Sequence, residues 1–141
     1  MSCYVRPALL SDAAAIAALE SDCFSLPRLR PQIEREIGNF LVAEADGAFL
    51  GYIDAQTVLD EGYIGNIAVI PESRGQGAGR ALLRSLIEQH RGVLSFLTLE
   101  VRESNLPARR LYESEGFRVV AVRRGMYEKP KEDGILMNYD Y

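Results

Sequence analysis

Three glycines fall within five residues of a single segment that separates an apolar stretch from an amphipathic one. The segment runs Arg74-Gly75-Gln76-Gly77-Ala78-Gly79-Arg80. Because glycine has no Cβ, the main chain of such a segment can come close to a ligand. A helix that starts there offers N–H groups without intrahelical partners and a positive dipole end, which suit a phosphate group. The residue types therefore predict an anion-binding loop, with Arg74 and Arg80 as cationic contacts at its rim.

Four interpretations of this loop differ in the ligand that it would hold. A mononucleotide P-loop needs Gly-Lys-Ser/Thr, but Arg80-Ala81 follows Gly79, so this class is excluded. A dinucleotide fingerprint needs G-x-G-x-x-G, and here the third glycine comes one residue too early. The pyrophosphate of coenzyme A suits the spacing Arg74-x-x-Gly77-x-Gly79. A glycine-rich turn without any ligand is the remaining alternative.

The loop needs a strand before it and a helix after it, and the pattern of apolar residues predicts both. We expect the strand at 63–70 and the helix at 78–90, with its leucines on one side. Around them strands and helices alternate, which is typical of a mixed α/β protein. The further expected strands are 4–6, 40–44, 48–59, 97–101, 117–122 and 135–137. Three further helices are expected. One follows an N-cap at Ser11, one lies at 31–37, and one follows an N-cap at Asn105 and ends at Gly116-Phe117.

Length and composition limit the class of protein. The chain has 141 residues, 48% hydrophobic and 26% charged, which predicts a single globular domain over residues 1–141. Its formal charge of −4 argues against charge-driven binding of nucleic acid. Cys3, Cys23 and His90 do not form the ligand pattern of a zinc site. Without a signal peptide pattern or a run of 18 apolar residues, we expect a cytoplasmic protein that does not interact with a membrane.

Several motifs, in order along the chain, resemble one enzyme family. They are Val58–Glu61, Asn66–Val69, Arg74–Leu83, Leu99–Arg102, Ser104-Asn105 and Leu111–Phe117, with a weaker likeness at Arg123–Tyr127 and Glu132–Met137. The third of these contains Q/R-x-x-G-x-G/A, the acetyl-CoA signature of the GNAT acyltransferase superfamily. More narrowly, the chain resembles the bacterial ribosomal-protein-alanine N-acetyltransferases.

The resemblance implies a fold, a donor and an acceptor. The fold is the α/β (α+β) GNAT fold, a mixed central sheet of about seven strands flanked by about four helices. The donor is acetyl-CoA, used as a co-substrate without a metal. The acceptor is a protein N-terminal α-amino group, closest to the N-terminal alanine of a small-subunit ribosomal protein. The implied protein is a monomer or a weak homodimer that acts without direct nucleic-acid contact.

The resemblance also assigns residues to the binding of acetyl-CoA. The main chain of the strand before the loop would hold the pantetheine, and the Val69 N–H would donate to the thioester oxygen. The loop N–H groups would bind the pyrophosphate, and Asn105 matches a position that contacts the cofactor. The full set of cofactor residues is Ile67, Ala68, Val69, Arg74, Gly75, Gln76, Gly77, Ala78, Gly79, Arg80 and Asn105.

Glu100 matches the general base of the family. A protein α-amine has a pKa of about 8, so a modest base or a water relay is sufficient to deprotonate it. In the predicted strand, Leu97, Leu99 and Val101 share one face, whereas Thr98 and Glu100 share the other. The alternative to a base is an exposed strand carboxylate in a salt bridge.

Two tyrosines match further positions of the family. Tyr112 matches the general acid that protonates the departing CoA thiolate, and a phenol is protonated at neutral pH. Its alternative role is core packing on a helix. Tyr127, expected between the last two strands, matches a residue that helps to bind the acceptor peptide. Its alternative is a loop aromatic that packs on the rim of the sheet.

The chain departs from the family pattern where the family forms its acceptor platform. The family commonly has Pro-Trp after Cys-Phe-Ser, whereas here Arg28 follows Pro27. Met126 also stands where an aromatic residue is frequent. The same chemistry on a small amine or a lysine side chain, and a non-catalytic acyl-CoA-binding module, are the alternatives.

Overall fold

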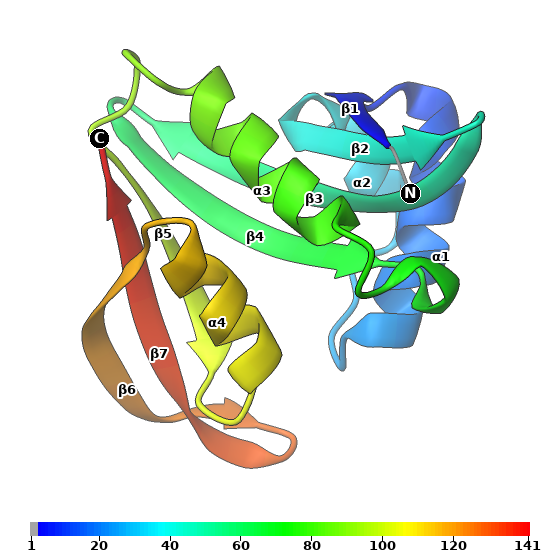
Figure 1. Ribbon diagram of the computed structural model, residues 1–141. Helices are drawn as coiled ribbons and strands as arrows, with labels where there is room; N and C mark the ends of the chain where they lie inside the picture. Colours follow the sequence, from blue (N-terminus) through cyan, green and yellow to red (C-terminus); the bar gives the residue numbers. More distant parts are fainter. Residues whose placement is uncertain (1–2) are drawn as a thin grey trace. The chain divides into compact units, whose positions relative to one another are not determined.

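The computed structural model describes residues 3–141, in which seven strands and four α-helices form a mixed α/β fold (Figure 1). This confirms the predicted fold class and element order. The strands are β1 (Tyr4–Pro7), β2 (Phe40–Ala45), β3 (Ala48–Val58), β4 (Glu61–Val69), β5 (Phe96–Arg102), β6 (Arg118–Glu128) and β7 (Lys131–Asp140). The helices are α1 (Ala13–Cys23), α2 (Arg30–Arg35), α3 (Ala78–Gln89) and α4 (Leu106–Ser114). Short 3₁₀ turns lie at Leu10–Asp12, Ile37–Asn39 and Pro71–Ser73.

The strands form one mixed sheet in the order β1-β2-β3-β4-β5-β7-β6. Strands β4 and β5 run parallel, whereas the pairs β1–β2, β2–β3, β5–β7 and β6–β7 run antiparallel. The parallel ladder joins Glu61–Tyr63 to Phe96–Thr98 and ends there. The later residues of β4 therefore lie beyond the ladder with β5.

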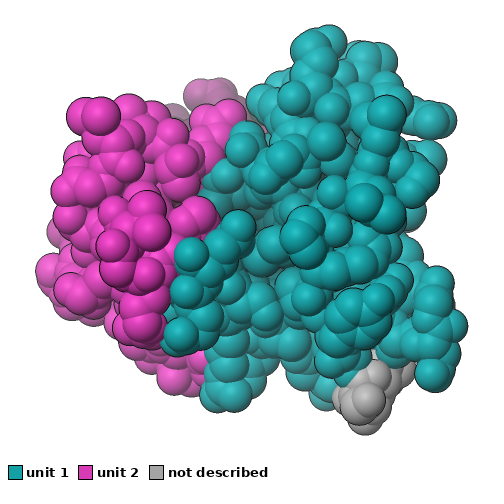
Figure 2. Space-filling model, turned by 90° about the horizontal axis from the view of Figure 1, so that it is seen from above, with its two compact units in different colours: residues 1–55, 65–89 teal, residues 56–64, 90–141 magenta. Residues whose placement is uncertain are grey.

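The chain divides into two compact units (Figure 2). The first contains residues 1–55 and 65–89, and the second contains residues 56–64 and 90–141. Strands β3 and β4 contribute residues to both units. The first unit contains β1, β2 and α1–α3, and the second contains β5–β7 and α4.

In the first unit, helices cover both faces of the sheet (Figure 1). Helices α1 and α2 pack on one face, where they bury Ala13, Ile16, Leu19 and Ile33 against Phe40, Val42, Tyr52 and Ala68. Helix α3 contacts β1 and β2 and buries its own leucines at 82, 83 and 86. Alternate residues of β2 point to opposite faces, and its first four residues are all buried, so this part of the strand is covered by helices on both sides.

In the second unit, α4 packs against the sheet through aromatic rings. The ring of Phe117 lies 5.8 Å from that of Tyr112 and 5.6 Å from that of Tyr139. The predicted helix end is confirmed, because Gly116 has φ +103° and the Phe117 N–H donates to the Tyr112 carbonyl at 3.0 Å. This Schellman-type ending turns the chain so that Phe117 enters the core directly after the helix.

Some expected boundaries were wrong. Ser11 is not an N-cap, since it lies inside a 3₁₀ turn, and α1 begins at Ala13. The Asp12 carboxylate instead accepts from the Leu9 N–H at 2.6 Å and from the guanidinium of Arg6 at 2.8 Å. Helix α2 ends at Arg35 rather than at 37, and β6 and β7 are several residues longer than expected.

Candidate active site

The end of β4 supplies main-chain groups on the first unit. Residues Ile67–Val69 lie beyond the end of the β4–β5 ladder. On the other side β3 comes so close that a Cβ on Gly51 would collide with the carbonyl oxygen of Ala68. The Val69 carbonyl accepts a hydrogen bond from Nε of Arg74 at 2.9 Å. The loop after β4 is therefore tied back to the last residue of the strand.

Two glycines of the loop adopt a backbone conformation that favours glycine. Gly75 has φ +76° and Gly77 has φ +93°, in a region that L-residues rarely adopt. Helix α3 starts at Ala78, and its first main-chain bond runs from the Ala81 N–H to the Gly77 carbonyl at 3.0 Å. The N–H groups of residues 78–80 thus precede the first helical bond, at the positive end of a 12-residue helix.

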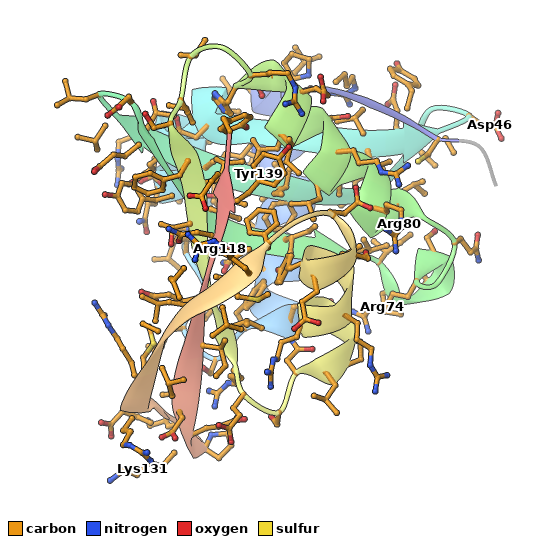
Figure 3. The ribbon with its side chains drawn as sticks, turned by 60° about the vertical axis from the view of Figure 1, so that its left-hand side comes forward. Asp46, Arg74, Arg80, Arg118, Lys131 and Tyr139 are labelled. Carbon is orange, nitrogen blue, oxygen red and sulfur yellow. The ribbon has the colours of Figure 1, made fainter. Side chains whose placement is uncertain are left out.

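Two arginines stand at the ends of this loop (Figure 3). Besides its bond to Val69, Arg74 places Nη2 3.5 Å from Sγ of Cys23. Gln76 donates from Nε2 to the Glu72 carbonyl at 3.2 Å, so its side chain closes the loop. Arg80 lies in the first turn of α3. The arrangement offers main-chain donors and positive charge to an anion.

A buried ionic cluster, which the sequence analysis missed, lies in the same unit. The Arg28 guanidinium donates to both oxygens of Asp54 at 2.9 Å and to Oε1 of Glu20 at 2.6 Å. The Tyr52 hydroxyl donates to the same Glu20 oxygen at 2.8 Å, and the Asn66 side chain does so at 3.1 Å. The cluster therefore joins the segment between α1 and α2 to strands β3 and β4.

The electrostatics of this cluster favour its charged form. Burial opposes ionisation of Glu20, but the hydrogen bonds from Arg28, Tyr52 and Asn66 outweigh it and lower the pKa of Glu20 to about 2. The Arg28 guanidinium also lies 5.1 Å from the centre of the Phe40 ring. The signal in the sequence was a glutamate on the apolar side of the first helix, because a buried carboxylate requires a cation.

In the second unit, the β5 alternation is as predicted. Leu97, Leu99 and Val101 are buried, whereas the Glu100 side chain is 44% exposed. Its Oε1 lies 3.8 Å from Nη1 of Arg123, which is itself mostly exposed. The salt bridge that we considered as an alternative is therefore present in loose form. An exposed carboxylate with a distant cation can still accept a proton from an incoming amine.

Tyr112 lies on α4 with its ring buried and its hydroxyl without a protein hydrogen bond among residues 3–141. Burial, and to a smaller extent the charge of Tyr127, raises the pKa of Tyr112 to about 12. The phenol is thus protonated throughout the neutral and mildly alkaline range. Packing and proton donation are compatible here, since the ring contact with Phe117 does not use the hydroxyl.

Tyr127 lies within β6 rather than between the last two strands, because β6 extends to Glu128. Its ring centre is 4.4 Å from the guanidinium carbon of Arg102. Burial and then the charge of Glu100 raise the pKa of Tyr127, while Arg102 lowers it. Tyr127 is therefore a half-buried strand residue that packs against Arg102, which agrees with the packing alternative, and its contact with the acceptor peptide stays a prediction.

Asn105 is the N-cap of α4, as predicted. Its Oδ1 accepts from the Ala108 N–H at 3.3 Å, and Pro107 occupies the first turn. This bond fixes the start of the helix that carries Tyr112. A contact of Asn105 with the cofactor remains a prediction, as do the other assigned roles.

The sequence matches the Acetyltransferase (GNAT) family over residues 11–117. This chain belongs to the GNAT family. The GNAT match spans Glu100, Asn105 and Tyr112 together with the glycine loop, whereas Tyr127 lies beyond it. The chain is accordingly an acetyltransferase by family, as the motifs predicted.

Bacterial acetyltransferases are among the proteins similar to this GNAT protein. It is 34% identical over 139 residues to a Bacillus subtilis protein provisionally named ribosomal protein bS18-alanine N-acetyltransferase, covering 94% of this chain and 92% of that protein. It is 45% identical over 103 residues to the Escherichia coli K12 enzyme of the same name, covering 70% of this chain and 68% of that enzyme. The crystal structure of the Escherichia coli ribosomal-protein-S18-alanine N-acetyltransferase superposes with a TM-score of 0.88 at 34% identity, covering 99% of this chain and 94% of that one.

The described part of this GNAT protein lacks the features of a metal centre and of a membrane-spanning helix. Within residues 3–141, no group of three or more His, Cys, Asp or Glu side chains is placed to hold a metal ion. Over the same residues, no helix combines the length and the apolar character that crossing a membrane requires.

The predicted site residues of this GNAT protein fall into two sets. The first unit holds residues 67–69 and the whole loop 74–80, so it brings all but one of the assigned cofactor residues together. The second unit holds Glu100, Asn105, Tyr112 and Tyr127. Within this second set, the charge of Glu100 contributes to the raised pKa of Tyr127, and the charge of Tyr127 contributes to the raised pKa of Tyr112.

Proposed function

We propose that this protein transfers the acetyl group of acetyl-CoA to the N-terminal α-amine of a protein, most closely the N-terminal alanine of a small-subunit ribosomal protein. The observation that carries the proposal is the likeness to the Escherichia coli bS18-alanine enzyme, 45% identical over 103 residues. Such an acceptor places the reaction in the cytoplasm. We further propose that residues 1–141 form one catalytic domain, acting as a monomer or a weak homodimer without direct contact to nucleic acid.

Acetyl-CoA is the acetyl donor of this enzyme. In our proposal, the N–H groups of residues 75–80 bind its pyrophosphate, aided by the charges of Arg74 and Arg80. The positive φ of Gly75 and Gly77 supports this role, because it presents main-chain donors without side chains in front of them. Residues 67–69 hold the pantetheine through the main chain that lies beyond the β4–β5 ladder. Asn105 contributes a further contact from the start of α4.

The reaction itself requires two protons to leave the nitrogen and one proton to reach the sulfur. Glu100, directly or through a water, takes a proton from the α-ammonium, and the neutral amine attacks the thioester carbon. The carbonyl oxygen gains negative charge in the tetrahedral intermediate, and the Val69 N–H donates to it. The intermediate collapses as the carbon–sulfur bond breaks, and Tyr112 gives its proton to the departing thiolate. The nitrogen loses its second proton, which returns through water to the Tyr112 phenolate, and Glu100 releases the first proton to solvent. The products are an N-acetylated terminus and coenzyme A.

The surroundings of each group support these roles. Glu100 is exposed and has one loosely held cation, so its carboxylate is accessible to an amine. Tyr112 carries its proton well above neutral pH, and its hydroxyl makes no hydrogen bond within residues 3–141 that would have to break. Tyr127, ordered beside Glu100, is proposed to bind the acceptor peptide close to the amine.

Release of coenzyme A with three acceptors tests the proposal. The first is a peptide with a free N-terminal alanine, the second is the same peptide with a blocked N-terminus and one lysine, and the third is a small primary amine. We expect release only with the first peptide, since a lysine amine with a pKa near 10.4 needs a stronger base. Turnover confined to the second or third acceptor would overturn the assignment. Binding of acetyl-CoA without release in any arm would favour a non-catalytic module.

A further inference from the structure

Arg102 holds the tip of the β6–β7 hairpin. It lies two residues after Glu100 and therefore on the same face of β5. Its Nη1 donates to the Pro130 carbonyl at 2.8 Å, and its Nη2 donates to the Lys129 carbonyl at 3.0 Å. Both carbonyls belong to the turn that joins β6 to β7. The planar guanidinium thus fixes the turn with two parallel bonds, which a lysine ammonium could not reproduce in this geometry.

A carboxylate connects this hairpin to the loop before α4. Glu132, one residue into β7, lies with Oε1 3.3 Å from Nη1 of Arg102, and its other oxygen accepts from the Ser104 N–H. These bonds, first from Ser104 and then from Arg102, lower the pKa of Glu132. The carboxylate is therefore charged at neutral pH. One arginine consequently links β5, the hairpin tip and the segment that leads to Asn105.

The same guanidinium covers Tyr127. Its carbon lies 4.4 Å from the ring centre, which is the stacking geometry of a cation–π contact, and only 26% of the Arg102 side chain is exposed. Tyr127 lies opposite Glu132 in the β6–β7 register. The ring of Tyr127, on β6, is therefore held by Arg102, on β5, across the intervening strand β7. Loss of Arg102 would release both the ring and the turn.

We propose that Arg102 is a positioning residue for the acceptor, which orients Tyr127 toward the peptide by fixing the hairpin tip and covering the ring. The proposal rests on the proposed function, in which Tyr127 binds the acceptor. Arg102 touches neither acetyl group nor amine, so its effect falls on acceptor binding and not on the chemical step. It determines how well the enzyme binds a peptide, and its contribution is separate from that of the glycine loop.

The test compares three variants with the wild-type enzyme by steady-state kinetics on the alanine peptide. Arg102→Gln removes the positive charge and the paired N–H donors of the guanidinium. Tyr127→Leu removes the aromatic ring, and the double variant combines the two substitutions. The control Arg118→Gln breaks an exposed pair with Asp140 at 2.9 Å, at the opposite end of the hairpin from Lys131 (Figure 3). Far-UV circular dichroism and the Kd for acetyl-CoA show whether each variant is folded.

We expect Arg102→Gln to raise the acceptor KM by about tenfold or more, with kcat and the acetyl-CoA Kd within about twofold. The double variant should show no larger KM than Tyr127→Leu alone, because Arg102 acts through Tyr127. The Arg118→Gln control should match the wild-type enzyme. In ¹³Cζ-tyrosine NMR, Arg102→Gln should raise the pKa of Tyr127 further, since the cation that lowers it is lost.

Two negative results have different meanings. If Tyr127→Leu leaves the acceptor KM unchanged, the proposed role of Tyr127 is wrong, and the role of Arg102 through it is wrong as well. If Tyr127→Leu raises KM but Arg102→Gln behaves like Arg118→Gln, only the inference on Arg102 is overturned. Should Arg102→Gln fail to fold, Arg102→Lys is used instead, because it keeps the positive charge but lacks the paired N–H donors of the guanidinium. Its KM should then lie above the wild-type value, and an unchanged KM would overturn the inference.

Discussion

Nη2 of Arg28 lies 2.6 Å from Oε1 of Glu20, whose side chain is completely buried. A buried ion pair contributes little net stability compared with an apolar substitute, but removal of one partner leaves an uncompensated charge. Here that charge would be shared by two carboxylates, since Arg28 also binds Asp54. The arginine that replaces the tryptophan of the family pattern is therefore part of the structure of the first unit.

Arg28→Met should destabilise the protein strongly. The variant keeps most of the side-chain volume but leaves Glu20 and Asp54 buried without their cation, and we expect a loss of about 3–5 kcal/mol in the free energy of unfolding. Urea denaturation followed by far-UV circular dichroism measures it. Arg118→Met, which breaks an exposed pair, is the matched control and should cost less than about 1 kcal/mol. Equal losses in the two variants would refute the importance of the cluster.

Stability should fall in acid because of Glu20. The pKa of Glu20 is lowered to about 2 in the folded protein from an ordinary value of 4.5, so the unfolded chain binds this proton first. Its contribution to stability is fully present above about pH 4.5 and is lost as the pH falls toward 2. Glu20→Gln should therefore show a flatter profile of unfolding free energy over that window. Parallel profiles for the wild-type protein and the variant would contradict the assignment.

Tyr112→Phe should separate chemistry from packing. The ring contact with Phe117 at 5.8 Å is retained while the proton is lost, so we expect kcat to fall by about 10²-fold with little change in thermal stability. Because the pKa of Tyr112 is about 12, the wild-type rate should show no decline from this group up to pH 10. The prediction is contradicted if the wild-type rate falls with an apparent pKa below 10 and this fall is absent in Tyr112→Phe. The phenol would then not be buried in the way that raises its pKa.

Gly77→Ala should weaken the binding of coenzyme A. A Cβ at Gly77 meets no atom within 4 Å, so the cost arises from the φ of +93°, which forces an L-residue to strain or to rearrange the loop. Gly38→Ala is the control, since a Cβ there is equally unobstructed and Gly38 has no positive φ. We expect calorimetry to show at least about tenfold weaker binding for Gly77→Ala only. Unchanged affinity would mean that the loop conformation is not used by the ligand.

Local rules predicted the elements that depend on neighbouring residues. The alternation of Leu97, Leu99 and Val101 gave the buried face of β5 and placed Glu100 on the other. The N-cap at Asn105 and the helix end at Gly116 were predicted because asparagine and glycine are strongly preferred at these two positions. The glycine loop was predicted for the same reason. In each case the residues that determine the conformation are adjacent in sequence.

Features that depend on distant residues were missed. The cap at Ser11 was wrong because Arg6, from β1, binds the Asp12 carboxylate and stabilises a 3₁₀ turn instead. The cluster around Arg28 joins residues up to 46 positions apart, as in the bond from Asn66 to Glu20. The length of the last hairpin was underestimated for a related reason. Its glycines and proline indicate loops locally, but pairing with β5 and the bonds from Arg102 extend the strands.

The central claim is that the acceptor is an N-terminal α-amine and the donor is acetyl-CoA. Its most direct test is one peptide that carries both a free N-terminal alanine and an internal lysine, incubated with the enzyme and acetyl-CoA. Tandem mass spectrometry then locates the acetyl group on the peptide. We predict a single acetyl group on the alanine nitrogen, which is absent with Glu100→Gln. Acetylation of the lysine alone would contradict the account.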